Sequence, residues 1–168
     1  EVTQKTYNNF DFRQWVLSNR RTFLSACLQF YSSSREERFS SLNPIPQLQE
    51  RINERCENFS NHTIGVHIRR TDNTFSIKNS PTELFIQRMK EEANKYSDVH
   101  FYLASDSPEE KKKLISVFGE RIITDWSPVS RSTTQGVQDA LVELYALSRT
   151  RKIIGSYYSS YSATAAEI

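Results

Sequence analysis

Residues 63–72 have the sequence TIGVHIRRTD, and the plan of the chain follows from them. Thr63–Ile68 is a short run of β-branched and apolar residues bounded by polar ones, which predicts a strand. Arg69, Arg70 and Asp72 follow at once, so charge gathers where this strand ends. Ligands of parallel sheets bind beyond the carboxyl ends of the strands. The stretch therefore predicts both a buried strand and a place for a ligand.

Helical and strand patterns alternate after this first strand. We expect further strands over Val99–Ala104, Arg121–Thr124 and Lys152–Gly155, and helices over Pro81–Tyr96, Pro108–Phe118 (ended by Gly119), Val137–Ser148 and Ser160–Ile168. On the third of these helices, the face expected to be buried consists of Val137, Ala140, Leu141, Leu144, Tyr145 and Ser148. The alternation predicts an α/β fold over residues 61–168, with a parallel sheet covered by helices on both faces.

Residues 1–60 differ from the rest, because they carry helical patterns without strands. A helix is expected over Asp11–Tyr31, a loop over Ser32–Pro46 and a short exposed helix over residues 47–58. We interpret residues 1–60 as a helical N-terminal segment that packs on the α/β domain or leads into it. The chain begins with Glu1 rather than Met, so we expect it to be a fragment or a processed product.

The composition excludes several classes of function. The 168 residues suffice for one domain with a substantial core, and a net charge of +2 gives no argument for binding nucleic acid or a membrane surface. Cys27 and Cys56 are too few for a disulfide framework or a zinc site, so we expect free thiols and no metal. No apolar run approaches a membrane span, and we expect a cytoplasmic protein, or a Golgi or secretory-lumen one if it is eukaryotic.

The strand ends hold the candidate phosphate ligands. Arg69 and Arg70 have the fork geometry that binds phosphate oxygens in pairs, and their alternative is ion pairing with Asp72 and Asp106. The segment Ser156–Ser160 precedes the last helix, where backbone N–H groups and serine hydroxyls bind anions. Its alternative is plain helix capping by Ser159 or Ser160. There is no GxGxxG and no GxxxxGK pattern, which argues against a standard dinucleotide site and a P-loop.

Three further residues have a weaker signal. Asp139 and Glu143 are four positions apart on one helix face, where they could accept hydrogen bonds from a guanine edge or from ribose hydroxyls. Alternatively, Asp139 interacts with the helix start and Glu143 is a solvated surface residue. His67 lies inside the first strand, where a packed and hydrogen-bonded histidine is more common than a catalyst.

The segment Gly65–Asp72, with the sequence GVHIRRTD, resembles the first motif of the α1,6-fucosyltransferases and the rhizobial nodulation fucosyltransferases. Similar blocks follow in the same order at Tyr102–Asp106, Ile123–Asp125, Glu143–Ser148 and Tyr158–Ser160. The resemblance implies that residues 61–168 form a Rossmann-like domain similar to the C-terminal half of a GT-B glycosyltransferase, which binds GDP-fucose. It implies metal-independent transfer of fucose to a glycan acceptor with inversion, and no cofactor.

The resemblance also implies roles at the strand ends. Arg69 would be catalytic, because it would bind the β-phosphate and stabilise the charge on the leaving GDP. The substrate-binding residues would be His67, Arg70, Asp72, Asp106, Asp125, Asp139, Glu143, Ser159 and Ser160. Asp106 would hold the loop or an arginine, and Glu143 would contact the guanine or the ribose.

The sequence departs from the family pattern in ways that leave alternatives open. Glu143 stands where the family has Asp, and the segment Asn73–Ser80 has no carboxylate where α1,6 enzymes have a candidate base. An acceptor-binding domain is not recognisable in residues 1–60, so we expect it in a missing N-terminal part. The alternatives are a transferase that uses another nucleotide sugar, a non-catalytic nucleotide-sugar-binding module, and an interaction domain with structural arginines.

Overall fold

The computed structural model describes residues 11–18, 21, 39, 42–127, 130 and 132–168. The chain divides into two units, Glu1–Ser33 and Ser34–Ile168. In the first unit the described element is α1 (Phe12–Ser18), whose start is capped by Asp11 Oδ1 accepting a hydrogen bond from Gln14 N at 2.9 Å. The remainder of the helix expected over Asp11–Tyr31, including Cys27, lies outside the described residues.

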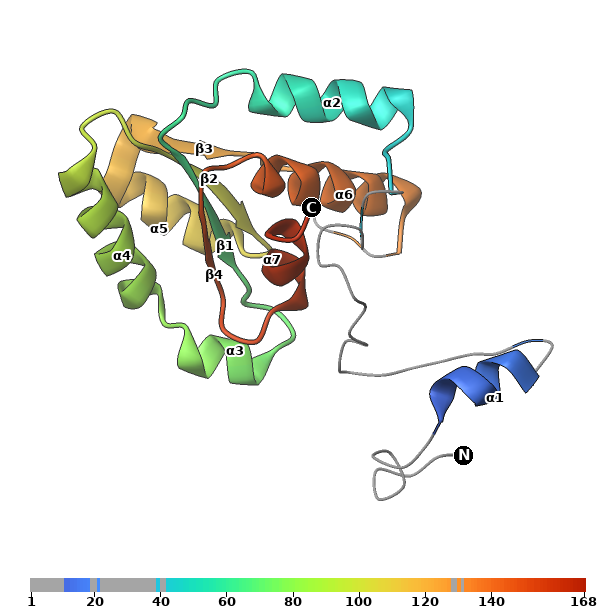
Figure 1. The fold of residues 1–168 in the computed structure, drawn as a ribbon. Helices are drawn as coiled ribbons and strands as arrows, with labels where there is room; N and C mark the ends of the chain where they lie inside the picture. Colours follow the sequence, from blue (N-terminus) through green and yellow to red (C-terminus); the bar gives the residue numbers. More distant parts are fainter. Residues whose placement is uncertain (1–10, 19–20, 22–38, 40–41, 128–129, 131) are drawn as a thin grey trace. The chain divides into compact units, whose positions relative to one another are not determined.

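The second unit is built on a four-stranded parallel sheet. Its strands are β1 (Thr63–Ile68), β2 (His100–Ser105), β3 (Ile122–Thr124) and β4 (Ile153–Gly155), in the spatial order β3-β2-β1-β4 (Figure 1). The chain moves outward from β1 to β3 and then returns to place β4 on the other side of β1. The order therefore reverses between β1 and β4, which makes this pair the topological switch point where ligands of such sheets bind. The predicted α/β fold with a Rossmann-like parallel sheet is confirmed.

One face of the sheet is covered by α4 (Thr82–Lys95) and α5 (Pro108–Phe118) (Figure 1). Alternate residues of a strand point to opposite faces, so one set from β1 and β2 meets these helices. This part of the core contains Ile64, Val66, Ile68, Phe101 and Leu103 with Phe85, Met89 and Leu114. Helix α5 ends at Gly119, where φ is +58°, as the sequence predicts.

The other face is covered by α6 (Thr134–Ser148) and α7 (Ser160–Ala165). The predicted face of α6 is only partly right: Leu141, Leu144 and Tyr145 are half-buried and pack against the core, whereas Val137 is 55% exposed. The fully buried residues Val142, Ala146 and Leu147 lie beside the predicted face, so the helix is rotated relative to the prediction. Leu147 comes so close to β1 that a Cβ at Gly65 would lie 3.0 Å from its Cδ2. The glycine therefore permits the close contact between the end of α6 and the sheet.

Helix α2 (Pro46–Cys56) is not the exposed helix that its mixed charge predicted. It lies in the second unit, and Leu48 and Ile52 are buried against Val142 of α6. Its arginines also reach across to the domain, since Arg51 pairs with Asp139 and Arg55 with Asp125. Both the apolar and the charged residues of α2 therefore contact the domain, because the two arginines find carboxylate partners on it.

The segment Asn73–Ser80 contains a short helix that the sequence analysis did not predict, α3 (Thr74–Asn79), capped by Asn73 Oδ1 accepting from Ser76 N at 3.0 Å. The described helices include none that is long and apolar enough to cross a bilayer. Cys56 is a half-buried free thiol whose pKa is raised by burial.

Candidate functional site

The ends of β1 and β4 are joined by hydrogen bonds across the switch point. Ser156, the first residue after β4, donates its backbone N–H to His67 O at 3.0 Å and its hydroxyl to the same oxygen at 3.2 Å. Its Oγ also accepts from Arg69 N at 3.0 Å. From the sequence, Ser156 was expected only as one member of the anion-binding segment Ser156–Ser160. The structure shows that it fixes the turn on which Arg69 lies.

Asp106, which follows β2, shapes the same turn from the other side. Its carboxylate accepts from Arg70 N at 2.7 Å, from Thr71 N at 3.1 Å and from Thr71 Oγ1 at 2.6 Å. A carboxylate that accepts several donors within one turn holds that backbone in place. Asp106 therefore acts on the loop backbone, and it pairs with neither arginine side chain in the hydrogen bonds observed.

Arg70 is tied into the fold by its side chain. Its guanidinium donates to Glu110 Oε1 at 3.0 Å and to Thr82 Oγ1 at 3.1 Å, and it lies over the Phe85 ring at 5.9 Å. The side chain is only 12% exposed. The sequence suggested a phosphate, Asp72 or Asp106 as the partner of the Arg70 side chain. The carboxylate observed beside it is that of Glu110. Arg70 thus joins the end of β1 to α4 and α5.

Arg69 has the more accessible guanidinium. It donates Nε to Asp72 Oδ1 at 2.6 Å and Nη2 to Asp72 Oδ2 at 2.7 Å, with side-chain exposures of 21% for Arg69 and 41% for Asp72. The hydrogen bonds to Asp72 raise the arginine pKa, so the group is always a cation. The carboxylate of Asp72 is 41% exposed, so this ion pair is open to solvent on its carboxylate side, from which a phosphate can reach the guanidinium.

His67 is buried beneath this turn. Its Nδ1 has no hydrogen-bond partner among the described residues, and its ring lies 4.9 Å from that of Tyr161 on α7. Burial lowers its pKa to about 4, an effect opposed by Asp106 and assisted by Arg69. At neutral pH the imidazole is therefore uncharged, and it carries one buried polar atom whose hydrogen bonding is unsatisfied.

Ser159, near the end of β4, also has a buried polar atom without a hydrogen-bond partner among the described residues. Ser159 is the N-cap residue of α7, but its Oγ makes no capping bond and has no partner within the described part of the chain. The plain capping role for Ser159 is therefore wrong. Ser160 is exposed, and Ser76 Oγ on α3 is a third buried atom without a described partner. Buried polar atoms without partners are rare, so these three atoms call for an explanation.

The carboxylates Asp125 and Asp139 are engaged by α2. Asp125 pairs with Arg55 and accepts from Ser127 N and Ser127 Oγ, both at 2.9 Å. Burial raises the pKa of Asp125, but these hydrogen bonds and the cation outweigh it, so the pKa is lowered. Asp139 pairs with Arg51 in the same way. Both side chains hold α2 on the domain, a role that sequence reasoning did not consider.

Glu143 lies by a small cavity of about 30 Å³ that is also lined by Arg55, Lys111, Asp125 and Ser127. Its Oε2 accepts from Tyr161 OH at 3.4 Å. Burial raises its pKa to about 7, although Lys111 lowers it. The alternative of a solvated surface glutamate is therefore wrong. A poorly paired carboxylate in a polar cavity is typical of a group that awaits hydrogen-bond donors.

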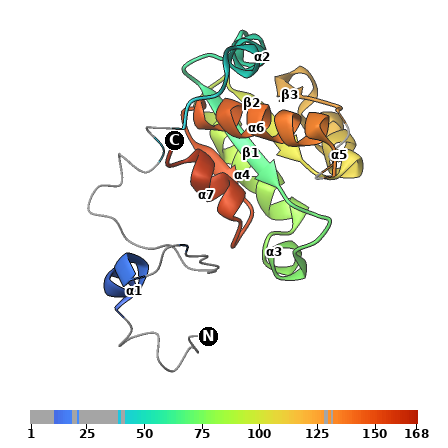
Figure 2. The ribbon, with the colours of Figure 1, turned by 90° about the vertical axis from the view of Figure 1, so that its right-hand side faces the viewer.

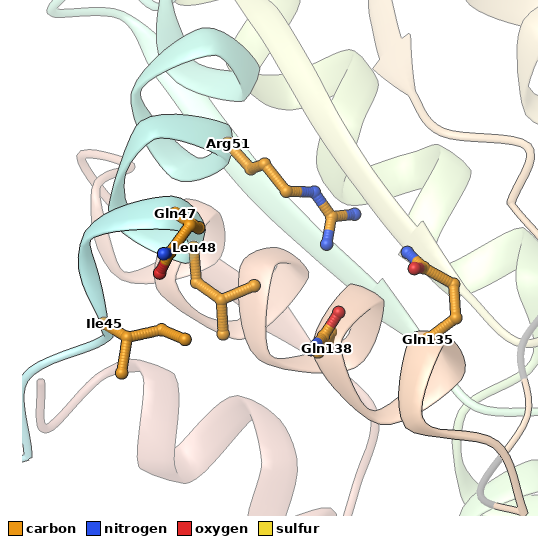
Figure 3. A pocket seen from close by; sticks show the side chains of 6 residues that line it. All are labelled: Ile45, Gln47, Leu48, Arg51, Gln135 and Gln138. Atoms are coloured by element: carbon orange, nitrogen blue, oxygen red, sulfur yellow. The ribbon is translucent and has the colours of Figure 1, made fainter.

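A larger pocket of about 430 Å³ lies between α2 and the start of α6 (Figure 3). Figure 3 shows Ile45, Leu48 and Arg51 on one side and Gln135 and Gln138 on the other, with the Arg51 head pointing across toward Gln135. None of the strand-end residues lines it. In the described part of the chain, no three His, Cys, Asp or Glu side chains gather as metal ligands would.

Comparison with known proteins supports the fold. No protein-family model matches the sequence, and no curated protein matches it. Solved structures do match, among them NodZ α-1,6-fucosyltransferase co-crystallized with GDP (24% identity, TM-score 0.54), NodZ soaked with GDP-fucose (22%, 0.54) and NodZ from Bradyrhizobium (24%, 0.53). The matches cover 71%, 71% and 72% of this chain and 40%, 42% and 41% of those chains. The chain therefore has a fucosyltransferase-like fold and spans about two fifths of the length of these proteins.

Proposed function

We propose that residues 61–168 are the donor-binding domain of a glycosyltransferase that transfers fucose from GDP-fucose to a glycan acceptor with inversion. The observation that carries the proposal is the position of Arg69. Its guanidinium follows β1 at the switch point, and it is held by a partly exposed carboxylate that a phosphate can replace. NodZ, which this chain resembles in fold over about two fifths of its length, has been co-crystallized with GDP and soaked with GDP-fucose.

In this proposal Arg69 binds the β-phosphate and acts when the bond to fucose breaks. The acceptor hydroxyl oxygen attacks the anomeric carbon on the side opposite to the diphosphate. The bond between that carbon and the β-phosphate oxygen breaks, and its electron pair leaves with GDP. The cation stabilises this new negative charge, and its turn is already in place because Ser156 accepts from Arg69 N and Asp106 accepts from Arg70 N.

The acceptor proton requires a base, and we place that base in a part of the protein outside residues 61–168. Helix α3 occupies the segment where the α1,6 enzymes have a candidate base, and it contains no carboxylate. His67, neutral and buried, supports the phosphate turn through packing and through its backbone carbonyl, which accepts from Ser156, rather than as a general base. The hydroxyls of Ser159 and Ser76 are further donors for phosphate oxygens.

Glu143 is the proposed contact of the nucleoside. The edge of guanine presents two neighbouring N–H donors, and a carboxylate accepts from both. Such donors would favour the ionised form of Glu143 and lower its raised pKa. The cavity beside Glu143 is small in this structure, so we expect base binding to move side chains that line it.

The second candidate function is a module that binds a nucleotide sugar without transferring it. It is favoured by the absence of a carboxylate in α3. A transferase releases GDP from GDP-fucose when an acceptor is supplied, whereas a binding module does not.

The first test is calorimetric titration of the chain with GDP, GDP-fucose, UDP and ADP. Arg69→Ala should weaken GDP binding about 10- to 150-fold, because charge-assisted hydrogen bonds contribute about 1.5–3 kcal/mol. Arg88→Ala is the matched control, since Arg88 also pairs with a carboxylate three residues later, Glu91, but on the exposed face of α4. Equal affinity for all nucleotides would contradict the GDP assignment, and an equal loss in both variants would contradict the role of Arg69.

A further inference from the structure

Three exposed aromatic side chains gather beside the phosphate turn: Phe75 on α3, and Tyr157 and Tyr158 in the loop between β4 and α7. The ring centroids are 5.7 Å apart for Phe75 and Tyr157, 6.2 Å for Phe75 and Tyr158, and 6.2 Å for the two tyrosines. Each side chain is more than half exposed, at 55%, 53% and 69%. We call these three residues the aromatic platform. Figures 1 and 2 both show α3 beside the loop after β4.

The backbone holds the platform in place. Tyr157 N donates to Ser80 Oγ at 2.7 Å, which ties the loop to the segment that carries Phe75. Tyr158 has a φ of +55°, in the left-handed region that favours glycine and asparagine. A large aromatic residue in this conformation costs about 1–2 kcal/mol. The chain thus keeps an exposed tyrosine at a position where a small residue would be more stable, as is typical of a functional surface.

The chemistry of the platform fits a sugar ring. The faces of aromatic rings are negatively polarised, and one side of a pyranose presents C–H groups whose hydrogens are weakly positive. The two tyrosines add phenolic hydroxyls, which donate to and accept from sugar hydroxyls. Exposed clusters of large apolar residues are rare on proteins and mark interaction sites. The rings are tilted at 52°, 89° and 37° to one another, so they do not form a flat stack for a planar base.

The position of the platform indicates which sugar it binds. Its residues come from the segments that follow β1 and β4, the two strands that flank the switch point. Tyr157 is the neighbour of Ser156, whose Oγ accepts from Arg69 N. A donor whose phosphates are held by Arg69 would therefore lie near the platform, whose rings are exposed to solvent. An acceptor that approaches the donor sugar from solvent on this side would meet these rings.

We propose that the aromatic platform binds a pyranose ring of the glycan acceptor. This inference rests on the proposed function, since it takes the turn at Arg69 as the donor phosphate site. It differs from that function in the ligand, the residues and the test. The platform binds by C–H contacts with aromatic faces, whereas the donor site binds through charge.

The experiment is saturation-transfer NMR on the chain in the presence of GDP, with saturation of the protein's aromatic protons. The probes are an N-acetylglucosamine trisaccharide, a mannose trisaccharide and methyl α-L-fucoside, the last standing for the donor sugar. We expect transfer to the ring C–H protons of at least one trisaccharide. Tyr158→Gly and Phe75→Leu should each reduce its affinity about 2- to 10-fold, because aromatic contacts contribute about 0.5–1.5 kcal/mol beyond area burial.

The variants separate loss of binding from loss of fold. Glycine adopts the backbone of Tyr158 without strain, so Tyr158→Gly should unfold at the same temperature as the wild type or higher. Tyr158→Phe and Phe75→Tyr keep the rings and should keep the trisaccharide signal. The GDP affinity of all four variants should equal that of the wild type, because the observed partners of Arg69 are Ser156 and Asp72 rather than a platform ring.

Each outcome decides one proposal separately from the other. Trisaccharide binding that depends on the platform supports it, even if the wild-type chain fails to bind GDP and the donor proposal falls. GDP binding without trisaccharide transfer overturns the platform proposal and leaves the donor proposal standing. A signal for methyl α-L-fucoside alone would assign the platform to the donor sugar and overturn the proposal. Self-association of the chain that Phe75→Leu abolishes would assign the platform to a second copy and overturn it as well.

Discussion

Glu143→Gln should stabilise the protein at neutral pH and leave its stability unchanged in mild acid. Glu143 is a half-buried residue beside Tyr161, and desolvation of its carboxyl raises the pKa from 4.5 to about 7. The unfolded chain ionises this group near pH 4.5, whereas the folded chain keeps it protonated until about pH 7. Between these values the folded state binds more protons, so its stability falls as pH rises.

The magnitude follows from the size of the shift. One pKa unit corresponds to about 1.4 kcal/mol, so a shift of about 2.5 units, from 4.5 to about 7, destabilises the folded protein by about 3 kcal/mol above pH 7. Glutamine is uncharged, has nearly the same shape and can still accept the hydrogen bond from Tyr161. The variant should therefore be more stable by about 3 kcal/mol at pH 8 and equally stable at pH 4.5.

His67 has the opposite effect and hides this slope in the wild type. Its pKa is lowered from 6.5 to about 4, so the unfolded state binds more protons between these values. Stability from His67 is fully present above pH 6.5 and is lost as pH falls toward 4. From pH 4.5 to 6.5 the contributions of Glu143 and His67 nearly cancel. Removal of Glu143 should reveal a stability that rises with pH through this window.

The assay is urea unfolding of both proteins from pH 4.5 to 8. Glu91→Gln is the control. The hydrogen bond from Arg88 holds the pKa of this exposed carboxyl below its usual value, so any stability it contributes depends on pH only below about 4.5. Its removal should therefore shift the free energy of unfolding equally at pH 5 and pH 8. The reasoning is refuted if Glu143→Gln shifts the free energy of unfolding by the same amount at pH 5 and pH 8. GDP should also reduce the advantage of the variant at pH 8, since the proposed guanine contact uses the ionised carboxylate.

Two further predictions concern the fold around the site. Arg70→Ala should lower the free energy of unfolding by about 3–5 kcal/mol, because the largely buried carboxylate of Glu110 loses its cation, whereas Arg88→Ala should cost less than about 1 kcal/mol. Similar losses in both variants, measured by urea unfolding, would show that Arg70 is not structural. Ile52→Ala should lower the free energy of unfolding by about 2–5 kcal/mol, because Ile52 is fully buried, and should expose the α2 amides to hydrogen exchange. In the control Val117→Ala, at an exposed position, the free energy of unfolding should fall by about 1 kcal/mol or less. Unchanged protection of α2 would contradict its packing on α6.

The sequence predicted where the site lies in the fold, but it did not predict which residues contact one another there. The rule that ligands bind beyond strand ends selected Arg69, Asp106 and Ser159 from local patterns alone, and the structure brings the segments that carry them to one edge of the sheet. The partners of these groups depend on residues far away in the chain. Asp106 accepts from the backbone N–H of Arg70, which lies 36 residues earlier. Glu110 accepts from the Arg70 guanidinium, at a separation of 40 residues.

Two candidate substrate ligands have structural partners that the sequence did not predict, for the same reason. Asp125 and Asp139 have the polarity of site residues, but they pair with Arg55 and Arg51 of α2, at separations of 70 and 88 residues. No local pattern shows such pairs. The aromatic platform was also missed, because Phe75 and Tyr157 come together only when β4 lies next to β1.

The sequence by itself determined the order and type of the elements around the sheet, because period-two and period-3.6 patterns are local and each strand or helix displays its own. It also determined the family that the fold resembles, through the block Gly65–Asp72 and its successors. Only the tertiary structure decided the strand order, the rotation of α6, the burial of α2 and the partner of each charge. These depend on which faces meet, and a face that is only partly apolar, such as that of α2, becomes buried when its charges find partners across the interface.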